Sequence, residues 1–322
     1  MASRGWTQDE LVTGVLAGDR RALARSISLV EDGEAEGIEI VRRVYPSTGR
    51  AASIGVTGPP GVGKSSLVSA LVGHTRGLGR SVGVVSVDPS SPFTRGALLG
   101  DRIRLADHFL DAEVYIRSMG TRGHLGGLAE TTLQAGLIVD ASGRDVVIYE
   151  TVGVGQSEVA VASLADTVAL VLMPGSGDSI QALKAGIMEI PDLIVLNKAD
   201  NPQVNLLRSE LKQVLTMAEK DSRPPVVETR ATDGYGVPEL WNRVTAHQEH
   251  LASSGALEER RRANLQREVF ALASARAARH LQHQVEQREE LRRLLDDVGE
   301  RRVDPLTAVT QILERVYELG GE

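Results

Sequence analysis

The sequence predicts an α/β protein with a mostly parallel β-sheet covered by helices on both faces, and with helical extensions at both ends. Seven short β-branched runs alternate with helix-length segments between residues 53 and 229, a pattern typical of βαβ units. After about residue 251 the strand-like runs end, and the chain becomes charged and rich in alanine, which favours helices. The chain has 322 residues, of which 42% are hydrophobic and 25% charged, as in a soluble globular protein.

The N-terminal extension, residues 1–50, is predicted to be helical. Thr7 and Glu10 have the spacing of a capping box, so a first helix is expected to begin there. Asp19 can cap a second helix. A third helix is expected to end near Pro46, because proline disfavours a helical conformation in the residue before it.

The α/β domain is predicted to span residues 51–250. The carboxyl ends of parallel strands lie along one edge of a sheet, and ligands bind at that edge. Polar residues that follow the strands are therefore candidates for a functional site. The predicted strands run from Ile54 to Thr57, Val82 to Asp88, Val114 to Arg117, Asp145 to Glu150, Thr167 to Met173, Leu193 to Leu196 and Val226 to Thr229.

The C-terminal extension, residues 251–322, is predicted to be a helical arm. Residues 257–295 read as one charged, alanine-rich helical stretch. A last helix is expected to be capped by Asp304 and to start at Pro305. Its predicted apolar face consists of Leu306, Val309, Ile312, Leu313, Val316 and Leu319.

Composition excludes several classes of function. The 36 basic and 43 acidic residues give a net charge of −7, so the chain lacks the broad basic surface of a nucleic-acid-binding protein. With no cysteine, disulfides, iron–sulfur clusters, thiolate zinc sites and cysteine nucleophiles are excluded. The longest apolar stretches are far shorter than the roughly 18 residues of a membrane span, and we see no secretory leader. We expect no membrane association and a cytoplasmic protein.

The segment GPPGVGKS at residues 58–65 is a complete Walker A motif between a predicted strand and a predicted helix. Glycines let the backbone N–H groups turn around phosphate oxygens. We expect Lys64 to contact the β and γ phosphates and Ser65 to bind Mg²⁺. The alternative is a glycine-rich turn without a ligand. The expected nucleotide contacts are Gly58, Pro59, Gly61, Val62, Gly63, Lys64, Ser65 and Ser66.

The sequence NKAD at residues 197–200 follows an apolar strand and has the pattern of a guanine-specificity motif. The carboxylate of Asp200 can accept from N1–H and from the exocyclic amino group of guanine, whereas adenine has no N1–H. Asn197 and Lys198 complete the predicted base contacts. A capped strand-to-helix turn is the alternative for these four residues alone. Together with the Walker A motif they predict GTP and GDP, rather than ATP, as ligands.

Two predicted strands end in carboxylates, at Asp88 and Glu150. Both should emerge at the edge of the sheet that holds the phosphate loop, where either could hold Mg²⁺ through water. A helix cap or a surface carboxylate is the alternative for each. Val154 stands where small GTPases place a water-positioning glutamine after a DxxG run, so unaided hydrolysis is expected to be slow.

Longer strings extend these motifs into a family resemblance over about residues 14–245. They are GDRRALARSISLVE, GPPGVGKSSL, VDPSSPFTRGALLGDRIR, TRGHLGGLAETT, YETVGVGQSE, PGSGDSIQALKAG and LNKAD. Together they resemble the signatures of the MeaB/ArgK family, which includes the methylmalonic aciduria type A protein. The resemblance implies a P-loop NTPase fold and a GTP-hydrolysing chaperone. It also implies a partner, an adenosylcobalamin-dependent acyl-CoA mutase, usually methylmalonyl-CoA mutase, whose cofactor loading the chaperone gates and which it protects.

The resemblance also implies three switch segments, 88–101, 150–156 and 175–184. Their candidate mechanistic side chains are Asp88, Asp101, Glu150, Asp178 and Lys184. Asp101 and Asp178 could instead cap helices, and Lys184 could be a solvated lysine. Three positions depart from the family pattern, and they are Arg95, Ser179 and the ETRAT segment around Ala231, which resembles the loop that backs the guanine.

Absent motifs and the C-terminal arm bear on the partners. The chain has neither a D-x-H-x-x-G string nor cysteines, so corrinoid chemistry is assigned to the partner. The arm is interpreted as a homodimer contact, and a helical cap on the core is the alternative. Two other functions remain open: a P-loop kinase acting on a small molecule or protein, and a nucleotide-gated binding protein with negligible turnover.

Overall fold

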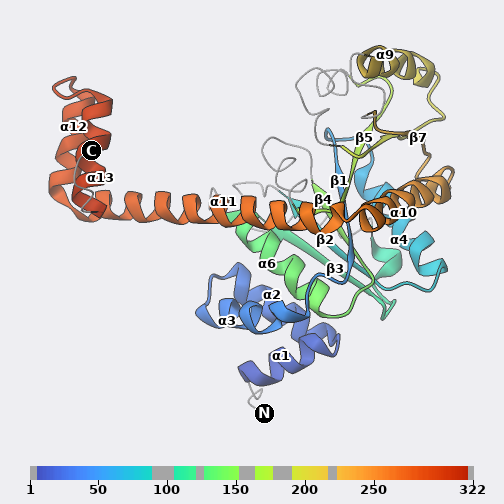
Figure 1. Ribbon diagram of the computed structural model, residues 1–322, viewed down its shortest axis with the longest axis horizontal. Helices are drawn as coiled ribbons and strands as arrows, with labels where there is room; N and C mark the ends of the chain where they lie inside the picture. Colours follow the sequence, from blue (N-terminus) through green and yellow to red (C-terminus); the bar gives the residue numbers. More distant parts are fainter. Residues whose placement is uncertain are drawn as a thin grey trace. The chain divides into compact units, whose positions relative to one another are not determined.

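The computed structural model describes residues 6–88, 105–120, 127–151, 164–176, 191–216 and 223–317. Its centre is a parallel sheet with the strand order β3-β2-β4-β1-β5-β6-β7 (Figure 1). The predicted strands are confirmed, with small shifts at their ends. They are β1 (Ala52–Thr57), β2 (Val82–Asp88), β3 (Val114–Gly120), β4 (Val146–Thr151), β5 (Thr167–Leu172), β6 (Leu193–Leu196) and β7 (Val226–Glu228).

Both faces of the sheet are buried, so successive strand side chains, which point to opposite sides, enter different apolar clusters. In β4, Val147 and Tyr149 join one apolar cluster, while Val146 and Ile148 join the other. Aliphatic residues make up most of both clusters, in keeping with an aromatic content of only 3%.

Helices cover each face of the sheet, as predicted. A short 3₁₀ turn, η2 (Ala106–His108), precedes β3. One face is covered by α1 (Gln8–Leu16), α2 (Arg20–Glu31), α3 (Ala35–Val44), α6 (Gly127–Ala141) and α9 (Val204–Thr216), and the other by α4 (Lys64–Gly77) and α10 (Val237–Ser254).

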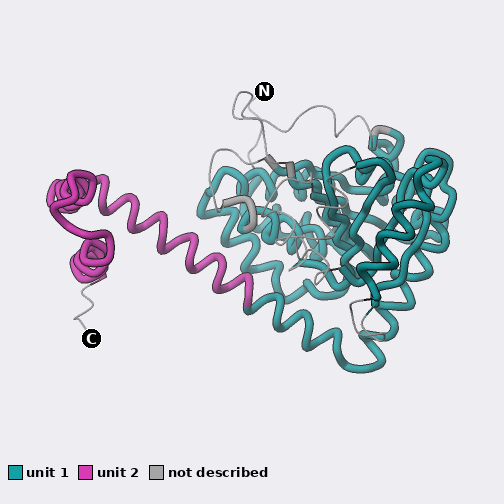
Figure 2. The backbone as a smooth tube through the Cα atoms, turned by 90° about the horizontal axis from the view of Figure 1, so that it is seen from above, with its two compact units in different colours: residues 1–266 teal, residues 267–322 magenta. Residues whose placement is uncertain are grey.

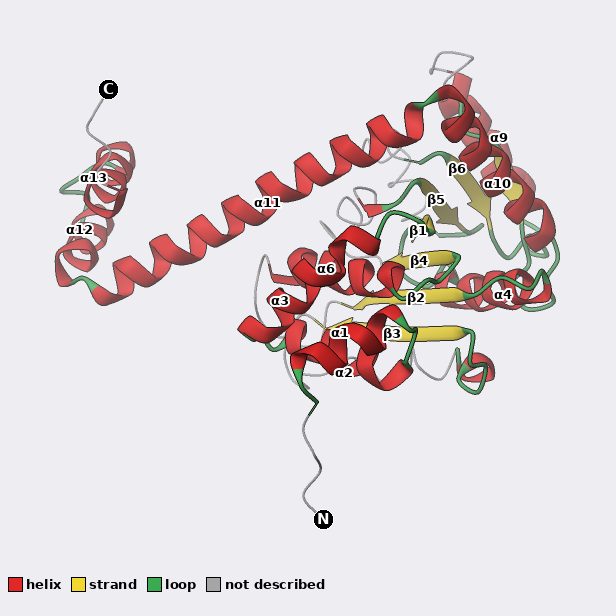
Figure 3. Cartoon of the chain, turned by 60° about the horizontal axis from the view of Figure 1, so that its bottom comes forward, coloured by secondary structure: helices red, strands yellow, loops and turns green. Residues whose placement is uncertain are grey.

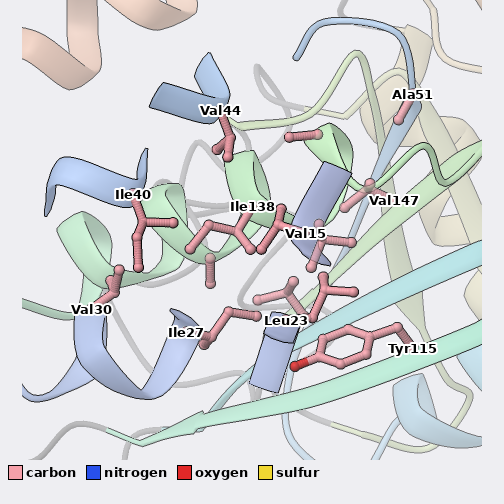
Figure 4. Close-up of a cluster of buried hydrophobic side chains, with 14 of the residues drawn as sticks. Val15, Leu23, Ile27, Val30, Ile40, Val44, Ala51, Tyr115, Ile138 and Val147 are labelled. Atoms are coloured by element: carbon pink, nitrogen blue, oxygen red, sulfur yellow. The ribbon is translucent and has the colours of Figure 1, made fainter. Parts of the chain in front are cut away.

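The N-terminal helices begin and end where the sequence indicates. The backbone N–H of Glu10 donates to Thr7 Oγ1 over 3.3 Å, and the N–H of Thr7 donates to the Glu10 carboxylate over 2.8 Å. Asp19 caps α2. The third helix stops at Val44, just before Pro46 in the 3₁₀ turn η1 (Tyr45–Ser47). Figure 4 shows side chains of these helices packed together with side chains of β3, β4 and α6.

The start of α11 (Ala256–Gln287) is tied to the amino-terminal edge of the sheet by two consecutive arginines. Arg260 forms two hydrogen bonds of 2.8 and 2.7 Å with Asp192, just before β6. Arg261 forms two of 2.8 and 2.7 Å with Asp166, just before β5, and also donates to the carbonyl oxygens of Gly49 and Ala51. Such forked pairs fix the relative orientation of the two side chains in addition to pairing their charges.

The chain divides into two compact units, residues 1–266 and 267–322, coloured separately in Figure 2. The stretch predicted to be helical consists of two helices: α11 ends at Gln287, Arg288 is extended, and α12 (Glu289–Gly299) follows (Figure 3). α12 packs against α13 (Pro305–Tyr317), and Leu291 and Leu294 of α12 are buried. Asp304 caps α13 as predicted.

No helix within the described ranges combines the length and the apolar character needed to cross a membrane. The described part of the predicted apolar face of α13 is only partly covered, since Leu306 and Val309 are exposed while Ile312, Leu313 and Val316 are half-buried. Leu319 lies outside the described residues.

Candidate nucleotide-binding site

The phosphate loop connects β1 to α4, and two of its glycines are required by close contacts. Gly58 has a φ of +139°, and a Cβ there would lie 2.1 Å from the carbonyl oxygen of Val171. Gly63 has a φ of +92°, and a Cβ there would lie 2.6 Å from Asn197 Nδ2. Both the positive φ values and the contacts exclude larger residues. The loop therefore lies directly against the ends of β5 and β6.

Lys64 is the first residue of α4, and it is buried. Its Nζ donates to the carbonyl oxygens of Gly58 and Pro59 over 2.6 and 2.8 Å. These bonds hold the ammonium group within the loop itself. The N-terminus of α4 adds the positive end of a helix dipole, so the loop has the two features that favour a bound phosphate. Ser66 lies in the first turn of α4 and is half-buried.

A hydroxyl–carboxylate pair lies beside Lys64 at the same helix end. Ser65 Oγ donates to Glu150 Oε1 over 2.6 Å, and Ser86 Oγ donates to Glu150 Oε2 over 3.0 Å. Glu150 lies on β4 and is only 3% exposed. The strand order explains why these three side chains lie together, because β4 lies between β2 and β1, and β1 leads into the phosphate loop. Ser86 belongs to none of the predicted site motifs, although a serine within an otherwise valine-rich strand is a usable signal.

Asp88 is the last residue of β2 and is paired with Gly120 of β3, which places its backbone at the same sheet edge. The other candidate mechanistic residues, Asp101, Asp178 and Lys184, lie outside the described residues, as do Arg95 and Ser179. Within the described part of the chain, no group of three or more histidine, aspartate or glutamate side chains has the geometry of a metal site.

Asn197 joins the phosphate loop to the segments that follow β6 and β7. It is 2% exposed, and its Nδ2 donates to the carbonyl oxygen of Val62 over 2.9 Å. Its Oδ1 accepts from Thr229 Oγ1 over 3.1 Å and from the backbone N–H of Ala231 over 3.3 Å. Thr229 lies in the ETRAT segment but is not among the predicted nucleotide contacts. One side chain thus fixes the spacing between the loop and the predicted base contacts.

Lys198 and Asp200 are exposed next to Asn197. Lys198 has a φ of +56°, an uncommon conformation for a residue with a side chain. Its Nζ donates to the carbonyl oxygen of Gly61 over 2.9 Å, so its side chain returns to the phosphate loop. The backbone N–H of Ala199 donates to the carbonyl oxygen of Thr229 over 3.0 Å, which holds the two loops together. Asp200 is therefore presented to solvent from a fixed turn.

Comparisons with known proteins agree with this arrangement. The family model described as "Methylmalonyl Co-A mutase-associated GTPase MeaB" matches residues 23–287. A protein of Pyrococcus abyssi is 46% identical to this chain over 97% of each sequence. GTPase ArgK of Escherichia coli is 35% identical, over 79% of this chain and 80% of its own. The mitochondrial methylmalonic aciduria type A homolog of Mus musculus is also 35% identical, over 79% of this chain and 66% of its own.

A solved structure extends the comparison to three dimensions. The crystal structure of a protein named LAO/AO transport system kinase matches with a TM-score of 0.74 and 27% sequence identity, over 97% of this chain and 98% of that chain. The phosphate loop between β1 and α4 and the Asn197 turn both lie within the residues that the family model matches. The chain therefore belongs to the MeaB family of P-loop GTPases.

Proposed function

We propose that this GTPase couples its nucleotide cycle to an adenosylcobalamin-dependent acyl-CoA mutase, gating the loading of the cofactor and protecting the enzyme. Methylmalonyl-CoA mutase is the first partner to test. The observation that carries the proposal is the family match across residues 23–287, whose description names that mutase. The name of the mouse relative refers to methylmalonic aciduria, which supports the same assignment.

The described side chains support distinct roles in GTP binding. Lys64 would exchange its bonds to the loop carbonyls for bonds to the β and γ phosphates. Asp200 would accept from N1–H and the 2-amino group of guanine. Asn197 and the backbone N–H of Ala231, which are hydrogen-bonded to each other, would border the base. The loops that carry these groups are already held together by the hydrogen bonds of Asn197 to Val62 and Ala231.

The donors beside Lys64 fit Mg²⁺, because a hydroxyl and a carboxylate lie 2.6 Å apart and both offer hard oxygen ligands. We assign Ser65 and Glu150 to this ion, with Asp88 as a further candidate at the end of β2. When bound, Mg²⁺ would offset negative charge on the phosphates. Ser86 would position the Glu150 carboxylate through its hydrogen bond of 3.0 Å.

The segments that the resemblance identifies as switches are proposed to contact the mutase. Asp101, Asp178 and Lys184 are assigned to them on the resemblance alone. We also propose that residues 251–322 form a subunit-contact arm of a homodimer. Exposed apolar side chains support the dimer, since Val269 and Phe270 on α11 are 63% and 73% exposed.

The test is a titration of purified methylmalonyl-CoA mutase against the protein loaded with GDP or with a non-hydrolysable GTP analogue, combined with phosphate-release assays. We expect different mutase affinities for the two nucleotide states and faster phosphate release with the mutase. By linkage, the mutase must then change the affinity for GTP by the same factor. Equal affinities, together with an unchanged release rate, would refute the proposed partnership and leave the GTPase activity intact.

The same assay tests the kinase alternative, which the name of the structurally matching protein, a transport system kinase, favours. A kinase would transfer the γ-phosphoryl group to an acceptor, and labelled phosphate would then appear on a small molecule or protein. We expect free phosphate instead, and Lys64→Ala should abolish it, because that change removes the fixed cation at the phosphate loop.

A further inference from the structure

The segment between β7 and α10 folds into a tight turn that fixes the side chain of Arg230. The backbone N–H of Arg230 donates to the carbonyl oxygen of Tyr235 over 3.0 Å. Arg230 Nε donates to Asp233 Oδ2 over 2.6 Å, while Asp233 Oδ1 accepts from the N–H of Tyr235 over 3.2 Å. The guanidinium group lies over the Tyr235 ring, 5.6 Å from its centroid. An arginine held by a carboxylate and an aromatic face has lost much of its freedom before any ligand binds.

The same turn places Arg230 next to Asp200. The hydrogen bond from Ala199 N–H to the Thr229 carbonyl joins the two loops. Asp200 directly follows Ala199 in one loop, and Arg230 directly follows Thr229 in the other. The adjoining strands β6 and β7 are paired up to Leu196 and Glu228. The hydrogen bond to Asp233 raises the pKa of Arg230, and the charge of Asp200 raises it further. A cation held by Asp233 and Tyr235 therefore lies near enough to act electrostatically on the carboxylate that is proposed to read the base.

We propose that Arg230 is a positioning residue for guanine recognition, acting as the counter-charge of Asp200 when a base covers that carboxylate. The inference rests on the proposed base-reading role of Asp200. In the free protein both groups are open to water, where a pair of charges contributes little. A docked base would displace water from Asp200 and offer it only neutral N–H donors. The neighbouring guanidinium would then offset the cost of taking the charge out of water.

Arg230 lies in the ETRAT segment, which departs from the family pattern, and its charge sets it apart from its neighbours. Thr229 and Ala231 on either side both bond to the Asn197 side chain. Arg230 between them is the only one of the three to contribute a charge. Its effect should depend on the base and not on the number of phosphates, so GDP and a GTP analogue should respond equally.

The experiment is a double-mutant cycle read as GDP affinity by calorimetry, using the full chain and the variants Arg230→Ala, Asp200→Asn and the pair. We expect Arg230→Ala to weaken GDP binding about fivefold, and a GTP analogue equally. In the Asp200→Asn background the same change should weaken GDP less than about twofold, because the amide carries no charge to compensate. Arg230→Lys should restore most of the affinity, whereas Arg230→Gln should not.

Arg208→Ala is the matched control, since Arg208 is also an exposed arginine paired with a carboxylate, Glu228. It should leave GDP affinity unchanged. Melting temperatures of all variants show whether the fold is intact, and Arg230 is exposed enough that its loss should change them little. Equal GDP affinity of Arg230→Ala and the parent would overturn the inference alone. Parental affinity in Asp200→Asn would overturn the proposed base contact as well.

Discussion

Replacement of Asn197 by alanine should destabilise the protein measurably, even in the absence of nucleotide. The side chain is 2% exposed and bonds to Val62, Thr229 and Ala231. Its removal leaves the Val62 carbonyl and the Thr229 hydroxyl, both in fully buried residues, without these partners. An unsatisfied buried polar group costs about 1–3 kcal/mol, so two in the lower half of that range give a loss of about 3 kcal/mol.

Urea unfolding without nucleotide, followed by tryptophan fluorescence, measures this loss. The chain has two tryptophans. Trp241 is 5% exposed in the same apolar cluster as the phosphate loop, while Trp6 is 43% exposed, so the change in emission should come mainly from Trp241. The slope of free energy against urea concentration should remain that of the parent.

Thr229→Val is the matched control, because it removes one partner of Asn197 and leaves the bond from Ala231. It should cost about 1 kcal/mol. The double variant should cost less than the sum of the two single changes by about 1 kcal/mol, since the two side chains are in contact. A loss below about 0.5 kcal/mol for Asn197→Ala would contradict the reasoning. It would mean that water or a shifted loop replaces the bonds.

Other buried contacts lead to three further predictions. Glu150→Gln should keep the fold within about 1 kcal/mol, because an amide can still bond to Ser65 and Ser86. Its GTPase rate should fall at least about a hundredfold at low Mg²⁺, and parental Mg²⁺ dependence would argue against the metal assignment. Arg261→Met should lower the free energy of unfolding in urea by about 3 kcal/mol, since Asp166 stays buried without its forked partner. GDP affinity should be unchanged. A loss of stability under about 1 kcal/mol would show that Arg261 does not anchor α11 to the sheet. Burial lowers the pKa of His247 in the folded protein below its usual value. As the pH falls through about 6.5, this histidine is therefore protonated in the unfolded chain before it is protonated in the folded one. The free energy of unfolding should therefore fall as the pH drops from 7 towards 5, and His247→Gln should make this pH dependence weaker. An equal slope of stability against pH in the variant and the parent would exclude His247 as the cause.

Local sequence patterns were sufficient to place the helix caps, the strands and the nucleotide loops. The capping residues Thr7, Asp19 and Asp304 act within three positions of themselves along the chain, so no distant contact is needed to predict them. A β-branched run of four to seven residues is likewise a local signal. The Walker A motif predicts a strand, a loop and a helix in order, which are β1, the phosphate loop and α4.

Strand order and register decided which of these residues meet. Glu150 lies 85 positions from Ser65, and Asn197 lies 135 positions from Val62, yet each pair is hydrogen-bonded. Periodicity shows which side chains of a strand are buried, but it does not show which strand is the neighbour. The ties between Arg261 and Asp166, and the closeness of Arg230 to Asp200, depend on the same long-range pairing. Their physical origin is the packing of distant segments, which no short sequence pattern encodes.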